Sequence, residues 1–163
     1  MILAIDPGTN ESGVVEYDPK GSIRWGCVKD NDDLLVMLRL MWQPDYTIVI
    51  EMVAPMGMTL GRSTRDTILL IGRIQEICDN RGIPCHPLTR AEVKMHLCGS
   101  MRAKDTNVRA AVAGRFEAIG GGSDPYKGTK AKPGPLYGIK SHCWSALALA
   151  VTYCETKGRH QCS

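Results

Sequence analysis

Apolar positions in the chain form two short runs that each end in an acidic residue. Residues 1–5 are all apolar and precede Asp6, and the largely β-branched run 46–50 precedes Glu51. Short apolar runs of this kind indicate buried strands. A carboxylate at the end of a buried strand costs desolvation free energy unless a partner compensates it. The pattern therefore predicts two carboxylates that converge on one divalent cation.

The remaining periodicity predicts an α/β fold in which a five-stranded mixed sheet carries helices on both faces. The first three strands should form an antiparallel meander, and prolines should keep the last strand near an edge of the sheet. The expected strands are 1–6, 12–17, 22–29, 46–51 and 83–88. The expected helices are 32–42, 64–80, 90–97, 104–118 and 142–156.

Polar residues mark the ends of several of these helices. Asn31 and Ser141 are predicted to cap the first and last helices, and Thr89 with Glu92 matches a capping box. The Gly-, Pro- and Lys-rich segment 119–140 has no periodicity and is predicted to be a flexible basic loop.

The composition indicates the class of protein and shows how charge is distributed along the chain. A length of 163 residues, 44% of them hydrophobic, predicts one globular domain. Residues 102–140 hold eight basic and three acidic residues. This excess suits a polyanionic substrate, although a solvated loop would have the same composition. Seven cysteines without a CxxC pair, with no signal peptide or long apolar run, predict reduced thiols in a soluble intracellular protein.

Five segments in this order resemble the RuvC-type Holliday junction resolvases of the ribonuclease-H-like superfamily. They span residues 5–13, 48–51, 69–73, 99–108 and 142–150. The resemblance covers most of the chain and implies a single RuvC-like nuclease domain over residues 1–163. It also implies a homodimer that uses Mg²⁺, or Mn²⁺ as a substitute, to cut branched DNA, with no membrane association. Phage relatives make the cytoplasm of a bacterial or phage-infected cell the expected location.

The resemblance also assigns residues to a metal-dependent crossover junction endodeoxyribonuclease. Asp6 would bridge the metals, Glu51 would bind one of them, and His142 would bind the second or orient water. Ser145 would hold a metal-bound water. The alternatives are a turn-forming aspartate, an ordinary strand-end glutamate, an exposed first-turn histidine and a small packing serine.

Ser145 departs from the family pattern, in which a second acid stands three residues after the position of His142. The chain could belong to a phage-like branch with another third acid, be an inactivated variant, or be a natural binder without catalysis. A natural branch is favoured, because engineered changes of aspartate are more often to asparagine or alanine. Asp105, Asp124 and Glu155 are the candidate substitutes. Glu155 lies too far along the last helix to be a good one.

Basic residues supply candidate DNA contacts. The best phosphate contacts are Arg102, Lys104 and Arg109, which would add affinity without sequence readout. Lys127, Lys130 and Lys132 would clamp a DNA arm from the loop or only solvate it.

Three functions remain open at this stage. A structure-selective endonuclease that resolves Holliday junctions leads, and a catalytically impaired branched-DNA binder of the same fold follows because of Ser145. An actin-like sugar kinase or ATPase shares the Asp-x-Gly-Thr motif on a first strand. That fold needs two such domains, which makes it a remote third.

Overall fold

The computed structural model describes residues 1–40, 45–53 and 61–157. Its strands are β1 (Ile2–Asp6), β2 (Glu11–Asp18), β3 (Ser22–Asp30), β4 (Thr47–Met52) and β5 (Cys85–Thr89). Its helices are α1 (Asn31–Leu40), α2 (Arg62–Arg81), α3 (Arg90–Cys98), α4 (Asp105–Ala113) and α5 (Cys143–Thr156).

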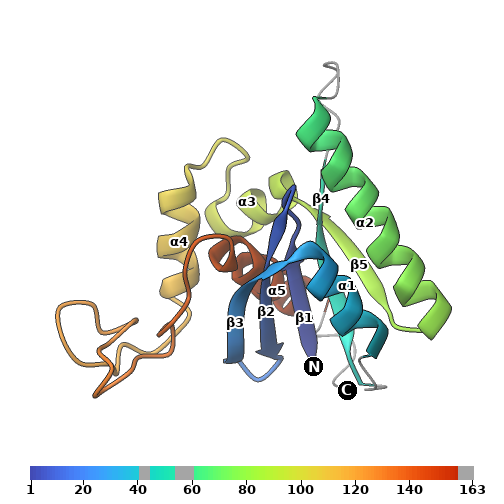
Figure 1. Cartoon of the computed structure of the whole chain (residues 1–163). Coiled ribbons are helices and arrows are strands. Elements are labelled where there is room, and N and C mark those ends of the chain that lie inside the picture. Colours follow the sequence, from blue (N-terminus) through green and yellow to red (C-terminus); the bar gives the residue numbers. More distant parts are fainter. Residues whose placement is uncertain (41–44, 54–60, 158–163) are drawn as a thin grey trace.

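The five strands form one mixed sheet in the order β3-β2-β1-β4-β5 (Figure 1). β1, β2 and β3 pair in antiparallel fashion, which confirms the predicted meander. β4 pairs parallel to both β1 and β5. β5 lies at an edge, as its prolines predict.

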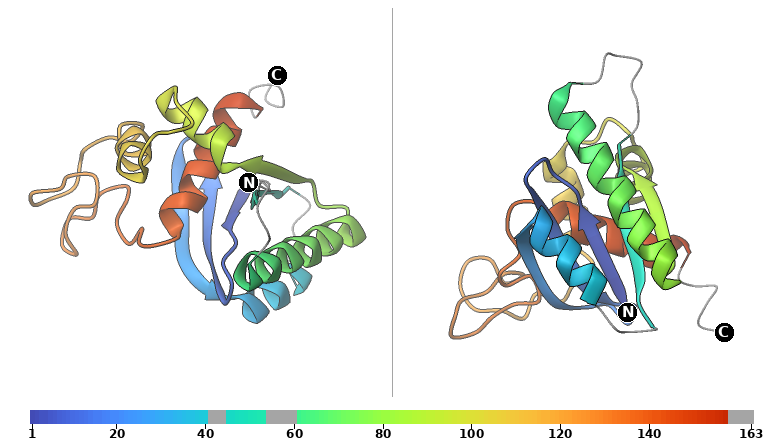
Figure 2. Two further views of the ribbon diagram at one scale, coloured as in Figure 1. Left: turned by 90° about the horizontal axis from the view of Figure 1, so that it is seen from above. Right: turned by 45° about the vertical axis from the view of Figure 1, so that its right-hand side comes forward.

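Residues of β1 alternate between two hydrophobic cores, one on each face of the sheet. Ile2 and Ala4 pack in the core that contains α5, whereas Leu3 and Ile5 pack in the core that contains α1 and α2. Strand side chains point alternately to opposite faces, so a central strand covered on both sides is apolar throughout. Figure 2 shows α1 and α2 on one side of the sheet and α5 on the other. The predicted α/β class with helices on both faces is confirmed.

Helix α5 is the most deeply buried helix of the described chain. It packs against β1, β2 and β4 and is flanked by α3 and α4. Such an environment requires a helix that is apolar on nearly all sides. Its buried residues are Cys143, Ala146, Leu147, Ala148, Leu149, Ala150, Val151, Thr152 and Tyr153.

Helix α4 is shorter than its sequence pattern predicts. The prediction extends to residue 118, but the helix ends at Ala113. Gly114 follows, and the next two amides donate to carbonyls three residues back, which tightens the chain into a turn. Glycine weakens helices because it loses more backbone freedom than other residues when it is ordered.

The segment 119–140 contains no helix or strand, as predicted, yet it is joined to the core. Leu136 is completely buried and Ile139 is 4% exposed. Backbone hydrogen bonds link parts of the segment, including Gly120 N to Pro125 O and Leu136 N to Tyr126 O, each at 2.8 Å. Its flexibility stays a prediction.

The described residues contain neither a helix that could span a membrane nor a disulfide bond. No helix there has the length and hydropathy needed to cross a bilayer. Six cysteines lie in these residues, and none of the six is in a disulfide bond.

Candidate active site

Asp6 ends β1 with its carboxylate beneath the first turn of α5. The alternation along β1 brings Asp6 to the same face as Ile2 and Ala4, which is the α5 side. The residue is 9% exposed. The Oδ2 atom of Asp6 lies 3.2 Å from Nδ1 of His142. The two residues are 136 positions apart in the sequence, so only the fold joins them.

Asn31 holds the turn that follows Asp6, a role that its sequence position does not reveal. Its side-chain amide donates to the carbonyl oxygens of Gly8 and Thr9, both at 3.1 Å. Its Oδ1 accepts a hydrogen bond of 2.7 Å from the buried Ser12 hydroxyl. The prediction that Asn31 caps the first helix is wrong. Asp30 does so, because its Oδ1 accepts from the Asp32 amide at 2.9 Å.

Glu51 lies beside Asp6 at the adjacent strand end. The parallel register pairs Ile5 with Ile50, so the next residue on each strand is an acid. The side chain of Glu51 is 17% exposed. The structure therefore brings together the two carboxylates that the strand pattern predicts.

His142 immediately precedes α5 and reaches Asp6 because Gly13 leaves room for it. Gly13 pairs with Asp6 in the sheet, and a Cβ on Gly13 would lie 2.5 Å from the His142 carbonyl oxygen. The prediction that Ser141 caps the last helix is wrong. Ser141 adopts a φ of 43°, and the cap position falls on His142, without a side-chain cap hydrogen bond.

Ser145 lies three residues after His142 and is half-buried. Its Oγ is 3.5 Å from Nη1 of Arg90. The hydroxyl also lowers the pKa of Asp6, although burial outweighs this effect. Ser145 thus faces the same site as Asp6 without adding a negative charge.

Arg90 is the residue of this site that the sequence analysis missed. Its guanidinium lies 3.6 Å from Glu51 Oε2 and 2.8 Å from Asp105 Oδ2. Lys94, one turn later on α3, lies 3.4 Å from the other oxygen of Asp105. The signal was available, because β5 runs parallel to β4 and Arg90 directly follows β5. A residue that directly follows β5 must lie at the same end of the parallel strands as Glu51.

Burial governs the protonation of both strand-end acids. Burial raises the pKa of Glu51 to about 7, with the charge of Asp6 adding to the shift and Arg90 opposing it. Burial also raises the pKa of Asp6, against the hydrogen bond and charge of His142. Both carboxylates therefore lack full compensation from the protein.

The donors present fit one hard divalent ion. Among the described residues, no group of three or more His, Cys, Asp and Glu side chains is arranged to hold a metal. Mg²⁺ needs fewer protein ligands than that, because it keeps several waters and binds one or two carboxylates together with substrate phosphates. Asp6 and Glu51 lie side by side, and the protein does not fully compensate their charges. They therefore supply the two carboxylates that such an ion needs.

The candidate substitutes for the missing acid lie in different places. Asp105 is on the rim of the site, where Arg90 and Lys94 lower its pKa despite its partial burial. Asp124 caps its own loop by accepting from the amides of Tyr126 and Lys127, each at 3.2 Å.

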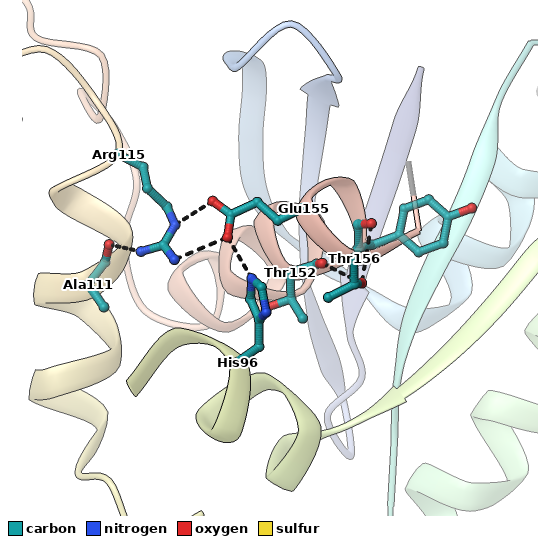
Figure 3. A network of polar contacts seen from close by, with 7 residues as sticks. His96, Ala111, Arg115, Thr152, Glu155 and Thr156 are labelled. Carbon is teal, nitrogen blue, oxygen red and sulfur yellow. Dashed lines mark hydrogen bonds and ion pairs between the residues drawn. The ribbon is translucent and has the colours of Figure 1, made fainter. Parts of the chain in front are cut away.

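Glu155 belongs to a separate network on the last turns of α5. It accepts from Arg115 Nε at 2.6 Å and lies 2.5 Å from His96 Nε2 (Figure 3). The hydrogen bond from Arg115 is the main reason that the pKa of Glu155 is lowered. Glu155 therefore joins α5 to α3 and to the turn that follows α4.

The fold brings two of the predicted DNA-binding residues together at Trp144. Arg109 and Lys127 each place a cationic group about 6 Å from the Trp144 ring centre, at 5.9 and 6.0 Å. Arg102 and Lys104 are exposed in the turn before α4. Lys130 and Lys132 are exposed in the 119–140 segment.

A pocket between α3, α4 and α5 adjoins the carboxylate pair. It opens beside Glu51 and continues toward the ring of Trp144. The polar and aromatic residues that line it with Glu51 are Arg90, Lys94, Asp105, Arg109, Trp144 and Ser145. Three of the lining residues, Arg90, Lys94 and Arg109, are cations, which suits a phosphate-bearing ligand.

Comparisons with known proteins bear on the fold. No protein-family model and no curated protein sequence matches the chain. The structure resembles that of Thermus thermophilus RuvC, with a TM-score of 0.62 and 21% identity over 98% of this chain and 96% of that one. It also resembles T. thermophilus RuvC in complex with a Holliday junction substrate, with a TM-score of 0.62, 22% identity and coverage of 98% and 95%. The chain therefore has the RuvC-like, ribonuclease-H-like α/β fold.

Proposed function

We propose that the chain is a metal-dependent, structure-selective DNA endonuclease that resolves Holliday junctions or related branched DNA. The observation that carries the proposal is the carboxylate pair Asp6 and Glu51, with His142 3.2 Å from Asp6, on a RuvC-like sheet. The T. thermophilus RuvC of similar fold binds a Holliday junction. The cytoplasm of a bacterial or phage-infected cell is the proposed location.

The side chains around the pair have separate tasks in phosphodiester hydrolysis. A bound Mg²⁺ or Mn²⁺ would supply a nucleophilic water at neutral pH and neutralise phosphate charge. Asp6 and Glu51 would hold that ion. His142 uses Nδ1 toward Asp6, which leaves Nε2 to orient a water or to carry a proton. Ser145 would hold a water without adding charge.

The basic residues and the exposed face of α2 fit a twofold complex with DNA. Arg102, Lys104 and Arg109 would bind phosphates beside the site, and Lys127, Lys130 and Lys132 would grip a DNA arm. A four-way junction needs two symmetric cuts, which a homodimer provides. Ile68 and Leu69 on α2 are 37% and 62% exposed, and they would lie in the dimer interface.

Cleavage of a synthetic four-way junction tests this function. The protein should make paired symmetric nicks with Mg²⁺ or Mn²⁺, and Asp6→Asn should bind the junction but not cut it. Lys20→Ala, in the exposed turn between β2 and β3, is the control and should cut normally. Cleavage that survives in Asp6→Asn would exclude this site as the source of activity.

A second candidate function is branched-DNA binding without catalysis. Ser145 favours it, because the family pattern has a carboxylate at this position. Under this alternative, the protein would bind four-way junctions with no metal-dependent nicking, and Ser145→Asp would restore cutting. Cutting by the unmodified chain rules this alternative out.

A further inference from the structure

Arg90 places a fixed positive charge next to the carboxylate pair. Its polar contacts are Glu51 Oε2 at 3.6 Å, Asp105 Oδ2 at 2.8 Å and Ser145 Oγ at 3.5 Å. These partners come from β4, α4 and α5, so the guanidinium joins three elements around one side of the site. Its charge also acts on Asp6.

The backbone and the carboxylate of Asp105 hold Arg90 in this place. It is the first residue of α3, directly after Thr89, and Thr89 forms a complete capping box with Glu92. Asp105 holds Arg90 on one carboxylate oxygen and Lys94 on the other. The side chain of Arg90 stays 43% exposed and lines the pocket that leads to Trp144. Its free donors can therefore reach a ligand in that pocket.

The charges around Arg90 favour one divalent ion. Three carboxylates, on Asp6, Glu51 and Asp105, face the two cations Arg90 and Lys94. At most one net negative charge remains before a phosphate enters, because Arg109 adds a third cation to the same pocket. Two divalent ions held about 4 Å apart would need more negative charge than this. Ser145, which contacts Arg90, contributes none.

We propose that Arg90 acts as the second cation of the site, beside a single divalent ion held by Asp6 and Glu51. Its guanidinium would donate to the oxygens of the scissile phosphate and stabilise the negative charge that develops during hydrolysis. Arginine suits this role because it is always charged and its planar fork matches phosphate oxygens. The inference rests on the proposed nuclease function and explains how a site with serine at position 145 can still cut.

Metal binding without DNA gives the first test, because it does not depend on cleavage. Mn²⁺ affinity would be measured by calorimetry on the unmodified protein, Arg90→Met and Arg90→Lys. Arg90→Met removes the cation beside Glu51, so it should bind Mn²⁺ about tenfold more tightly. Arg90→Lys keeps the charge and should stay within about twofold of the unmodified protein. Equal affinities for all three would overturn the inference.

Single-turnover cutting of a four-way junction gives the second test. Arg90→Met should bind the junction but cut it about 10²- to 10³-fold more slowly, with Arg90→Lys recovering part of the rate. A bound, non-cleavable junction should carry one Mn²⁺ per chain in the unmodified protein. Two ions per chain, or a rate for Arg90→Met within about threefold of the unmodified protein, would refute the role of Arg90.

Controls separate this inference from the nuclease function and from simple unfolding. Arg24→Met removes an exposed arginine that pairs with Asp18 on the β2–β3 ribbon, and it should change neither metal affinity nor cutting. Thermal unfolding of each variant shows whether it is folded. If the unmodified protein does not cut junctions, the proposed function fails. If it cuts and Arg90→Met cuts equally well, only the role of Arg90 fails.

Discussion

Gly13 and His142 lie so close together, where β2 meets the start of α5, that a side chain at position 13 would collide with His142. A Cβ on Gly13 would lie 2.5 Å from the His142 carbonyl oxygen and 2.7 Å from its Cβ. Gly13 is also the β2 partner of Asp6. The missing side chain at position 13 thus determines how near His142 comes to Asp6.

Gly13→Ala should therefore damage the site more than an ordinary glycine substitution. The added methyl must push the start of α5 away, which we expect to cost about 2–4 kcal/mol of unfolding free energy and most of the cutting activity. Urea denaturation and junction cleavage measure the two effects. Gly114→Ala, at the end of α4, is the matched control and should change stability by less than about 0.5 kcal/mol, because a Cβ there makes only ordinary contacts, the nearest at 3.5 Å from the Ala110 carbonyl oxygen. Similar stability for both variants would contradict this contact.

Glu51 should make the metal-free protein less stable as the pH rises. Its pKa is about 7 when folded and near 4.5 when unfolded, so the folded state holds the proton more tightly. Below about pH 4.5 the group is neutral in both states, and the penalty of burying its charge grows through about pH 7, to roughly 2–3 kcal/mol. Denaturation in EDTA at about pH 5 and about pH 8 should show this loss. Glu51→Gln should abolish most of it.

Glu155→Gln should weaken the fold without affecting metal binding. Arg115 and His96 pair with Glu155 at 2.6 and 2.5 Å, and its pKa is lowered mainly by the Arg115 hydrogen bond. Its stabilisation, roughly 1 kcal/mol, is present above the unfolded pKa and is lost as the pH falls through the folded value. Calorimetry should find Mn²⁺ affinity unchanged. A tenfold loss of affinity would instead place Glu155 among the metal ligands.

Trp144 should report DNA binding through its fluorescence. Arg109 and Lys127 lie close to its ring, so a phosphate that draws either cation away should change the emission. Trp144→Phe should lose this change, although Trp25 and Trp42 remain. Arg109→Ala and Lys127→Ala should each lower the salt slope of junction binding by about 1. An unchanged slope in both variants would remove these residues from the DNA contacts.

The positions of Asp6 and Glu51 were predictable because they depend on strand periodicity. The apolar runs before Asp6 and Glu51 indicate central strands, and the parallel register of β1 and β4 then aligns the two acids. Local signals also sufficed for the capping box at Thr89. These features depend on residues near one another in the sequence or on a single strand pairing.

The missed features depend on how separate elements cross in space. The pairing of β4 and β5 could have placed Arg90 near Glu51, but its contact with Asp105 exists only because α3 and α4 pack together, which no local pattern encodes. Asparagine is a common N-cap residue, but the side-chain amide of Asn31 donates to the carbonyl oxygens of Gly8 and Thr9 instead. Ser141 adopts a left-handed φ of 43°, which sequence patterns associate with glycine or asparagine and not with serine.

The packing of α5 against the sheet sets the order in which the parts of the candidate site come together during synthesis. Asp6 and Glu51 leave the ribosome before His142 and α5, which come later in the sequence than all five strands. An unfinished chain carries both acids and no assembled centre. Because the partners of Asp6 are so distant in sequence, folding of this region should also be slow compared with local helix formation. Under the proposed function, a nascent chain cannot cut DNA before α5 has been synthesised and packed on the sheet.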